Sequence, residues 1–277
     1  MNTGVEDALG ISWRLSALVK GYGGSHLLDS YESEHRPIMI QRLERCFEHV
    51  GVHGPYYEAY AKHGSTITAD TPEGVELRDQ LKAHFDAIGP EVLDRGIELD
   101  SRYKSSVICL TPDDGPEPAW EVKKYTPSTY PGSRAPHIFL KDGKTSIFDR
   151  FGPEWSLVTF VGSCEIYRVA VEEAEIFMAV ADEMSIPVHN VTLVNENHAR
   201  AIWGYNFVLV RADGHVAWRG QYVPKAKDEI RGILRVVTGW DVCKGYVQRA
   251  MLSKLEILQQ EYPERKAMVV EEKFQTG

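Results

Sequence analysis

One turn of a predicted helix in this 277-residue chain carries an acid, a titratable base and a fixed cation. His35 and Arg36 follow Glu32 by three and four residues, a spacing that brings side chains together on a helix. A histidine titrates near neutral pH, and a carboxylate and a guanidinium beside it can orient it for proton transfer. Glu32, His35 and Arg36 are therefore candidate catalytic residues. The alternative is a solvated helix face or a salt-bridged helix end.

Three aromatic residues could line a cavity for a small molecule. Trp13, Tyr31 and Tyr103 combine an apolar ring with a polar N–H or O–H group, a combination suited to ligand pockets. We predict substrate contacts for Trp13 and Tyr31, and we add Tyr103 to the candidate catalytic residues. The alternative is that all three rings belong to an ordinary core, as apolar residues at helical spacing usually do.

Other residue types that carry chemistry form no strong pattern. His49 and His53 are four residues apart, but nearby glycines weaken the helix and no third ligand has a suggestive spacing. We therefore predict no metal site. Cys164 follows an apolar run, about where a thioredoxin has its reactive cysteine, but no second cysteine accompanies it. We expect Cys164 to be a structural thiol.

A dinucleotide site needs a glycine-rich turn that leaves a strand and begins a helix, so that the pyrophosphate meets the helix N-terminus. The only glycine cluster, Gly21-Tyr22-Gly23-Gly24, follows a predicted helix instead. The sequence therefore predicts no nucleotide-binding site in this chain.

The first part of the chain has the periodicity of helices. Thr3 and Glu6 have the spacing of a capping box and predict the start of a helix, which the glycines at 21–24 end. A second helix should follow these glycines and end or kink at Pro37, because proline lacks an N–H and disfavours helical geometry in the residue before it. We interpret residues 1–110 as a helical layer.

A composition change separates this layer from the rest. Six of the fourteen prolines lie between 111 and 136, and this stretch is the predicted linker. Residues 137–277 then read as β-α-β-β-β-α, the element order of a thioredoxin-like domain. The predicted fold class is α/β, with a helical N-terminal layer before a thioredoxin-like domain that has a central mixed sheet. Strands are expected at 157–161, 188–194, 207–210 and 215–218, and helices at 169–184, 227–237 and 242–260.

Composition excludes several classes of partner. Thirty-one Lys and Arg residues against 40 Asp and Glu give a net charge of -9, which disfavours binding to nucleic acid or to an anionic membrane surface. None of the four cysteines belongs to a C-x-x-C motif, which argues against a zinc or disulfide framework. No apolar run reaches the ~20 residues that a membrane-spanning helix needs. We expect a cytoplasmic protein with a small-molecule substrate.

Several segments resemble the FAD-dependent aromatic hydroxylases, the group that includes phenol 2-monooxygenase. They are MNTGVEDA (1–8), WRL (13–15), LDSYESEHRP (28–37), GIEL (96–99), PGSRAPH (131–137) and DGHVAWRG (213–220). The resemblance implies that backbone amides near Asn2, Thr3 and Gly4 are vestiges of a flavin-ring contact. It also implies that the second half is the family's thioredoxin-like C-terminal domain, which is often used for dimer contacts.

The departure from the family is as informative as the match. Family members are roughly twice as long, and the half that carries their G-x-G-x-x-G motif has no counterpart in this sequence. We therefore expect no bound cofactor, and we expect the apolar faces left uncovered to be buried in a homodimer.

Three functional hypotheses follow. The first is a cofactor-free enzyme of natural-product biosynthesis that orients a small molecule for cyclisation or isomerisation, such as an intramolecular cycloaddition. The second is half of an FAD-dependent hydroxylase, which needs FAD and a separate N-terminal half. The third is a non-catalytic, thioredoxin-like dimerisation module.

Overall fold

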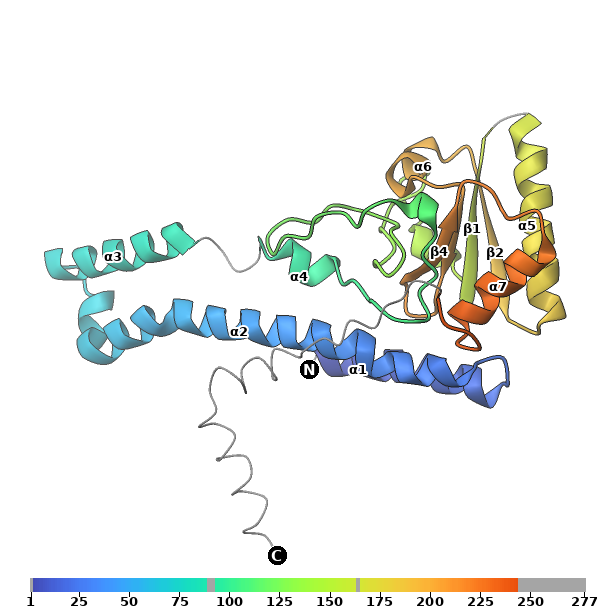
Figure 1. The fold of residues 1–277 in the computed structure, drawn as a ribbon. Helices are drawn as coiled ribbons and strands as arrows, with labels where there is room; N and C mark the ends of the chain where they lie inside the picture. The colour runs from blue at the N-terminus through green and yellow to red at the C-terminus, as the bar shows by residue number, and fades with distance from the viewer. Residues whose placement is uncertain (1, 89–92, 163–164, 244–277) are drawn as a thin grey trace, which may run out of the picture. The chain divides into compact units, whose positions relative to one another are not determined.

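Two long helices begin the chain, and a mixed sheet flanked by helices follows them (Figure 1). The computed structural model describes residues 2–88, 93–162 and 165–243. The helical part comprises α1 (Asn2–Val19), α2 (Ser25–Thr68), α3 (Pro72–Ile88) and α4 (Arg95–Leu99). The later part comprises β1 (Trp155–Val161), α5 (Glu165–Glu183), β2 (Val188–Val194), α6 (Asn197–Trp203), β3 (Phe207–Val210), β4 (Val216–Gly220) and α7 (Lys227–Val237). The predicted α/β class is confirmed.

The start of α1 differs from the expected capping box. The helix already includes Asn2, so Thr3 lies within its first turn and is not the N-cap. The carboxylate of Glu6 is engaged elsewhere, because it accepts hydrogen bonds from Arg42 and Tyr103. The capping-box prediction was therefore wrong, since tertiary contacts of Glu6 replace the local one.

The helix α2 continues through Pro37, contrary to the expected end or kink there. Non-helical backbone dihedrals inside α2 occur only at Gly64. A proline within a helix removes one hydrogen bond and costs about 3 kcal/mol. The neighbouring side chains of Glu34 and His35 are buried and bonded to other elements, and these contacts stabilise the helix locally.

The sheet has the order β2-β1-β3-β4, in which β1 pairs parallel with β2 and antiparallel with β3. The β3–β4 hairpin turns at Gly214, which has a φ of 79° that suits glycine. Every residue of β1 is buried, as expected of a central strand with both faces covered. The mixed thioredoxin-like sheet is thus confirmed, while α6 was not predicted.

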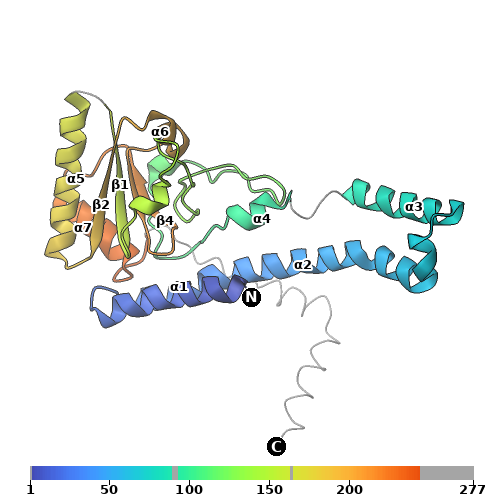
Figure 2. The same cartoon turned by 180° about the vertical axis from the view of Figure 1, so that it is seen from behind.

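Helices cover both faces of this sheet. Figure 2 shows α5 and α7 on one side of the strands and α6 on the other. The first core lies under α5 and α7 and also takes in Trp13 and Ala17 from α1. The second core lies under α6 and includes Trp203 and residues 135–147. The helical layer therefore shares the first core with the sheet domain.

The proline-rich stretch 111–136 is bound closely to the sheet domain. The Gly132 N–H donates to the Val216 carbonyl at 2.7 Å, and the Thr129 hydroxyl donates to the Trp203 carbonyl at 2.5 Å. Arg219 of β4 donates to the Asp114 carboxylate at 2.6 Å. The exact domain boundaries stay a prediction. The helix expected over 242–260 lies almost wholly outside the described residues.

The glycine cluster at 21–24 connects α1 to α2 and packs on the end of α7. The Gly24 N–H donates to the Thr238 carbonyl at 2.8 Å, and the His26 N–H donates to the Gly239 carbonyl at 3.1 Å. A side chain at Gly24 would clash with backbone atoms of Gly239. These glycines therefore permit a close backbone approach between two parts of the fold.

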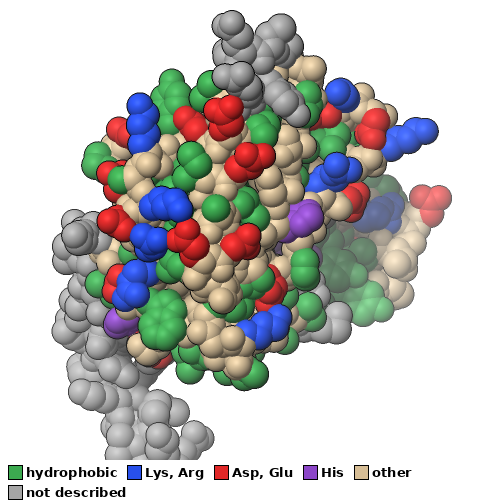
Figure 3. All heavy atoms as spheres, turned by 90° about the vertical axis from the view of Figure 1, so that its right-hand side faces the viewer, with side chains coloured by type: hydrophobic (Ala, Val, Ile, Leu, Met, Phe, Trp, Pro, Cys, Tyr) green, Lys and Arg blue, Asp and Glu red, His purple; other side chains and the backbone are tan. Residues whose placement is uncertain are grey.

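Acidic and basic side chains are interspersed on the face shown in Figure 3. Glu183 of α5 pairs with Lys227 and Arg231 of α7, at 2.9 and 2.6 Å. Among the described residues, no helix combines the length and the apolar character required to cross a bilayer.

Candidate functional site

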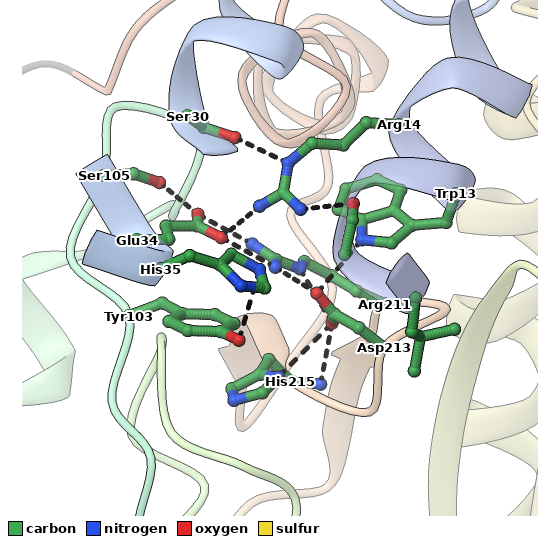
Figure 4. Close-up of polar contacts among 12 residues, drawn as sticks. Trp13, Arg14, Ser30, Glu34, His35, Tyr103, Ser105, Arg211, Asp213 and His215 are labelled. Atoms are coloured by element: carbon green, nitrogen blue, oxygen red, sulfur yellow. Dashed lines mark hydrogen bonds and ion pairs between the residues drawn. The ribbon is translucent and has the colours of Figure 1, made fainter. Parts of the chain in front are cut away.

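A fully buried carboxylate lies between two arginines where the helical layer meets the sheet domain (Figure 4). Arg211, just after β3, donates from Nη1 and Nη2 to Oε1 and Oε2 of Glu34, at 2.8 Å each. Arg14 of α1 donates to Oε2, and the Ser105 hydroxyl donates to Oε1. Bidentate, charge-assisted hydrogen bonds are among the strongest in proteins. Glu34 therefore fastens α2 to both α1 and the sheet.

A second carboxylate, Asp213 in the β3–β4 turn, extends this network. It accepts hydrogen bonds from Arg211 and, at 3.1 Å, from Nε1 of Trp13. The Nδ1 atom of His215 lies 3.4 Å from its Oδ1. The Trp13 ring lies 4.7 Å from the guanidinium carbon of Arg14 and 4.9 Å from that of Arg211, within cation–π range.

The network contains two arginines and two carboxylates, and the arginines lower the pKa values of both carboxylates. Burial would raise the pKa of Glu34, but Arg211 and Arg14 outweigh it, so the net shift lowers that pKa. Burial would likewise raise the pKa of Asp213, but Arg211 and then His215 hold it well below its usual range. Both carboxylates are therefore ionised at neutral pH, opposite two arginines.

Four aromatic rings lie one beside the next along the charged network; the first contact is tilted and the other two are stacked. Tyr31 lies on His35 with ring centroids 4.7 Å apart, His35 lies 5.2 Å from Tyr103, and Tyr103 lies 4.0 Å from His215. Of the predicted site residues, Tyr31, His35 and Tyr103 are thus brought together. The stack links α2 to the β3–β4 hairpin.

His35 is the only histidine among the predicted catalytic residues. Its Nδ1 lies 2.9 Å from the Asp7 carboxylate, and its Nε2 lies 3.4 Å from the Tyr103 hydroxyl. Burial lowers the pKa of His35, and the hydrogen bond to Asp7 opposes this only in part. In a neutral imidazole, Nδ1–H would donate to the Asp7 carboxylate, while the single proton of the Tyr103 hydroxyl is donated to Glu6 at 3.3 Å. Burial also raises the pKa of Tyr103, which keeps its proton.

We expect the stability of the chain to fall between pH 7 and pH 5, partly because of His35. A base whose pKa is lower in the folded than in the unfolded chain stabilises the fold above its unfolded pKa, about 6.5, and this contribution is lost as the pH falls. Urea unfolding at both pH values measures the loss. The loss of stability between pH 7 and pH 5 should be smaller in His35→Gln than in the wild type. The control is His26→Gln, because the His26 side chain is 44% exposed, and this variant should lose as much stability as the wild type. Equal losses in all three proteins would contradict this assignment.

The other two candidates from the same helical turn do not join His35. Glu32 and Arg36 form an exposed ion pair at 2.8 Å on the solvent side of α2. This is the salt-bridged helix face that the sequence analysis kept as the alternative. The residue between them that does reach the buried network is Glu34.

Sequence analysis missed the four charged residues at the centre of the network. They are Arg14, Glu34, Arg211 and Asp213. A signal for two of them existed, because Arg14 shares a helix face with the buried Ala17, and Glu34 shares one with the buried Leu27 and Ser30. A charged residue at a buried helix position implies an opposite charge from another element.

A pocket of about 290 Å³ opens beside Trp13, between α1 and the loop before β1. Its wall is mostly apolar, with polar groups from serine, tyrosine and glutamate. The lining residues are Leu9, Ser12, Trp13, Ser16, Tyr22, Pro153, Glu154 and Ala212. Of the predicted substrate contacts, Trp13 reaches it. The volume lies just below the range of about 300–1,000 Å³ that is typical of ligand pockets.

The two histidines considered as metal ligands have different partners. His49 Nε2 lies 2.8 Å from the Asp94 carboxylate, whereas the His53 ring packs 6.0 Å from Phe85. Over residues 2–88, 93–162 and 165–243, no group of three His, Cys, Asp or Glu side chains is placed to hold a metal ion. Cys164 lies outside the described residues.

Both parts of the chain match one class of enzyme. Residues 128–240 match the model of the aromatic-ring hydroxylase C-terminal family, and residues 1–46 match an FAD binding domain. The FAD-dependent monooxygenase opdD of Penicillium oxalicum is 32% identical over 88% of this chain and 45% of its own length. Phenol 2-monooxygenase of a Pseudomonas species is 26% identical over 79% of this chain and 39% of its own length. The chain spans less than half the length of these relatives.

Solved structures of related enzymes also match this chain over most of its length. RebC-10x, in its native and K252c-bound forms, matches with a TM-score of 0.68 and 30% identity, over 86% of this chain and 42% of RebC-10x. The flavin-dependent monooxygenase PieE, in complex with FAD and substrate, matches with a TM-score of 0.66 and 27% identity, over 86% of this chain and 44% of PieE. In sequence and fold, the chain corresponds to the C-terminal half of the FAD-dependent aromatic-ring hydroxylases.

Proposed function

We propose that this chain acts as the C-terminal half of an FAD-dependent monooxygenase of natural-product biosynthesis, and that residues outside it supply the flavin-binding half. The observation that carries the proposal is the α1–α2 pair. Residues 1–46 match an FAD binding domain, yet the charged network around Glu34 joins them firmly to the sheet domain. A related structure is described as a rebeccamycin biosynthetic enzyme, which supports the natural-product setting.

The residues at the start of α1 fit the ring end of a flavin. The first N–H groups of a helix lack helical partners and can donate to a ligand oxygen. Thr3 is half-buried and Gly4 is exposed, and a Cβ built on Gly4 would meet no atom within 4 Å. The side chain of Asn2 lies outside the described part. These amides can therefore approach a flat ring closely.

The nucleotide end of FAD finds no comparable partner among the described residues. The glycine cluster at 21–24 is packed against Thr238 and Gly239, so its amides are not available to a pyrophosphate. We therefore propose that this chain contacts the flavin ring of FAD and that the separate flavin-binding half binds its adenine nucleotide.

When bound, FAD supplies the redox chemistry that hydroxylation requires. This chain's own residues would position and shield the ring. The Glu34 network fixes the position of α1, and Glu6 in its second turn is held by Arg42 and by the Tyr103 hydroxyl at 3.3 Å. The stack of Tyr103 on His35 then excludes water from the sheet side of α1.

Exposed apolar side chains on α1 and α2 support the proposal that a separate flavin-binding half packs against these helices. Val5 is 67% exposed on α1, and Phe47 and Val50 are 73% and 67% exposed on α2. Apolar side chains at helical spacing on one face usually mark an interaction surface. We propose that the flavin-binding half covers them, while the predicted homodimer stays a prediction.

A chimaera tests the proposal. In it, this chain replaces the matching region of the Penicillium relative, downstream of that protein's own flavin-binding half. We expect the purified chimaera to hold one FAD and to reduce it with NADPH. Gly4→Pro, which removes one first-turn amide N–H at a helix position that tolerates proline, should weaken FAD binding about tenfold. Gly4→Ala keeps the N–H and should bind FAD like the parent.

A second function is favoured by one observation, the pocket beside Trp13. Its apolar wall with a few polar groups suits the cofactor-free cyclisation or isomerisation of a small molecule. The same experiment separates the two functions. A chimaera that folds but holds no flavin, together with conversion of a metabolite by this chain alone, would overturn the first proposal in favour of the second.

A further inference from the structure

Two cysteine thiols from distant parts of the chain meet at the edge of the sheet domain. Cys109 lies in the segment that follows Tyr103, and Cys243 lies six residues after the end of α7. Their thiols are hydrogen-bonded to each other, and both are reduced in the structure. Cys243 is 7% exposed, while Cys109 is half-buried against the first core.

Backbone hydrogen bonds fix both cysteines in this arrangement. The Cys109 N–H donates to the Ala217 carbonyl of β4 at 2.9 Å, and the Cys243 N–H donates to the Ser106 carbonyl at 2.9 Å. The Cys243 sulfur also lies 3.8 Å from the Leu110 carbonyl oxygen. Segment 105–110 is therefore held between β4 and the chain after α7, so that Cys243 lies against the segment that contains Cys109.

We propose that Cys109 and Cys243 form a reversible disulfide bond, with a peroxide as the oxidant. The Cys243 thiolate attacks one oxygen of hydrogen peroxide, an S–O bond forms, the O–O bond breaks, and hydroxide leaves as water after protonation. The Cys109 thiol then attacks the Cys243 sulfur, an S–S bond forms, the S–O bond breaks, and the thiol proton joins the departing hydroxide to give a second water. The two thiols lose two electrons and the peroxide gains them, so a dithiol reductant restores the starting state.

The surroundings divide the roles between the two sulfurs. The hydrogen bond from the Cys109 thiol lowers the pKa of Cys243 to about 6, and burial opposes this only in part. The thiolate is the reactive form of cysteine, so Cys243 is the attacking sulfur and Cys109 the resolving one. The disulfide would close a long loop between two fixed segments, and such a closure stabilises the folded state by restricting the unfolded chain.

Peptide mapping of the whole chain after treatment with hydrogen peroxide tests the proposal. We expect a mass loss of two hydrogens, one cross-linked peptide pair that joins Cys109 to Cys243, and complete reversal by dithiothreitol. The oxidised protein should unfold at a Tm about 5 °C or more above that of the reduced protein. A cross-link to any other cysteine, or oxidation to sulfinic acid without a cross-link, would overturn the proposal.

Three serine variants sharpen the test. Cys109→Ser and Cys243→Ser should each abolish the cross-link and the rise in Tm. Cys46→Ser, at an exposed cysteine on α2, is the matched control and should keep both. If a variant does not fold, mapping of the wild-type peptides still decides the matter, since the absence of the Cys109–Cys243 pair there contradicts the proposal.

Discussion

Glu34→Gln is expected to lower the free energy of unfolding by about 3–5 kcal/mol, the usual cost of breaking a buried ion pair from one side. The substitution keeps the size of the side chain but leaves the guanidinium groups of Arg14 and Arg211 opposite a neutral amide. Both groups have 0% exposed side chains, so water cannot replace the lost charge. Urea unfolding at pH 7 measures the change.

The matched control is Glu32→Gln, two residues away on the exposed side of α2. This substitution breaks a surface ion pair and should cost no more than about 1 kcal/mol. A further test adds Arg14→Met to Glu34→Gln, which removes one unpaired cation and should recover part of the lost stability. Equal effects of the two glutamine substitutions would show that the network does not hold the helical layer on the sheet domain.

Gly24→Ala is expected to lower the free energy of unfolding by about 1–3 kcal/mol, because the site has no room for a side chain. A Cβ atom there would lie 2.3 Å from the Gly239 carbonyl oxygen and 2.6 Å from the Trp240 nitrogen. Both are backbone atoms, so they cannot rotate away. The turn between α1 and α2 would have to separate from the end of α7, which can be measured as a lower Tm and a lower urea midpoint.

Gly51→Ala provides a control with the opposite sign. Gly51 is an exposed residue inside α2, and a Cβ there would have open space around it. Alanine in an exposed helix interior is favoured over glycine by about 0.5–1 kcal/mol, so this variant should be more stable than wild type. Destabilisation by both substitutions would mean that local backbone strain, and not the contact with α7, accounts for the effect at Gly24.

The regular elements of the sheet domain were accessible from sequence because their signals are local. The helix expected over 227–237 has those bounds in the structure, and the four strands lie within two residues of their predicted positions. An apolar run bounded by turn residues, or an apolar stripe with helical period, requires no knowledge of distant residues. The missed α6 is only seven residues long, too short for a clear period.

The candidate site depended far less on local signals. Glu32, His35 and Arg36 have the spacing of one helical turn, but the orientation of α2 against α1 and the hairpin buries His35 and leaves the other two in solvent. A spacing on a helix indicates which residues are neighbours, but not which of them face the core. Continuation of α2 through Pro37 has the same origin, since contacts from other elements stabilise the helix on both sides of the proline.

The sequence by itself determined the class of the fold and the relation to the aromatic-ring hydroxylases. It also showed that the chain has no glycine-rich turn of the nucleotide-binding kind. Each of these conclusions depends only on residues that are close together in the sequence. Only the tertiary structure decided that Glu34 meets Arg211, 177 positions away, and that Cys109 meets Cys243. Pairs so distant leave no periodic trace in one sequence. Their meeting is set by how the helical layer packs on the sheet, where a buried charge is stable only opposite its partner.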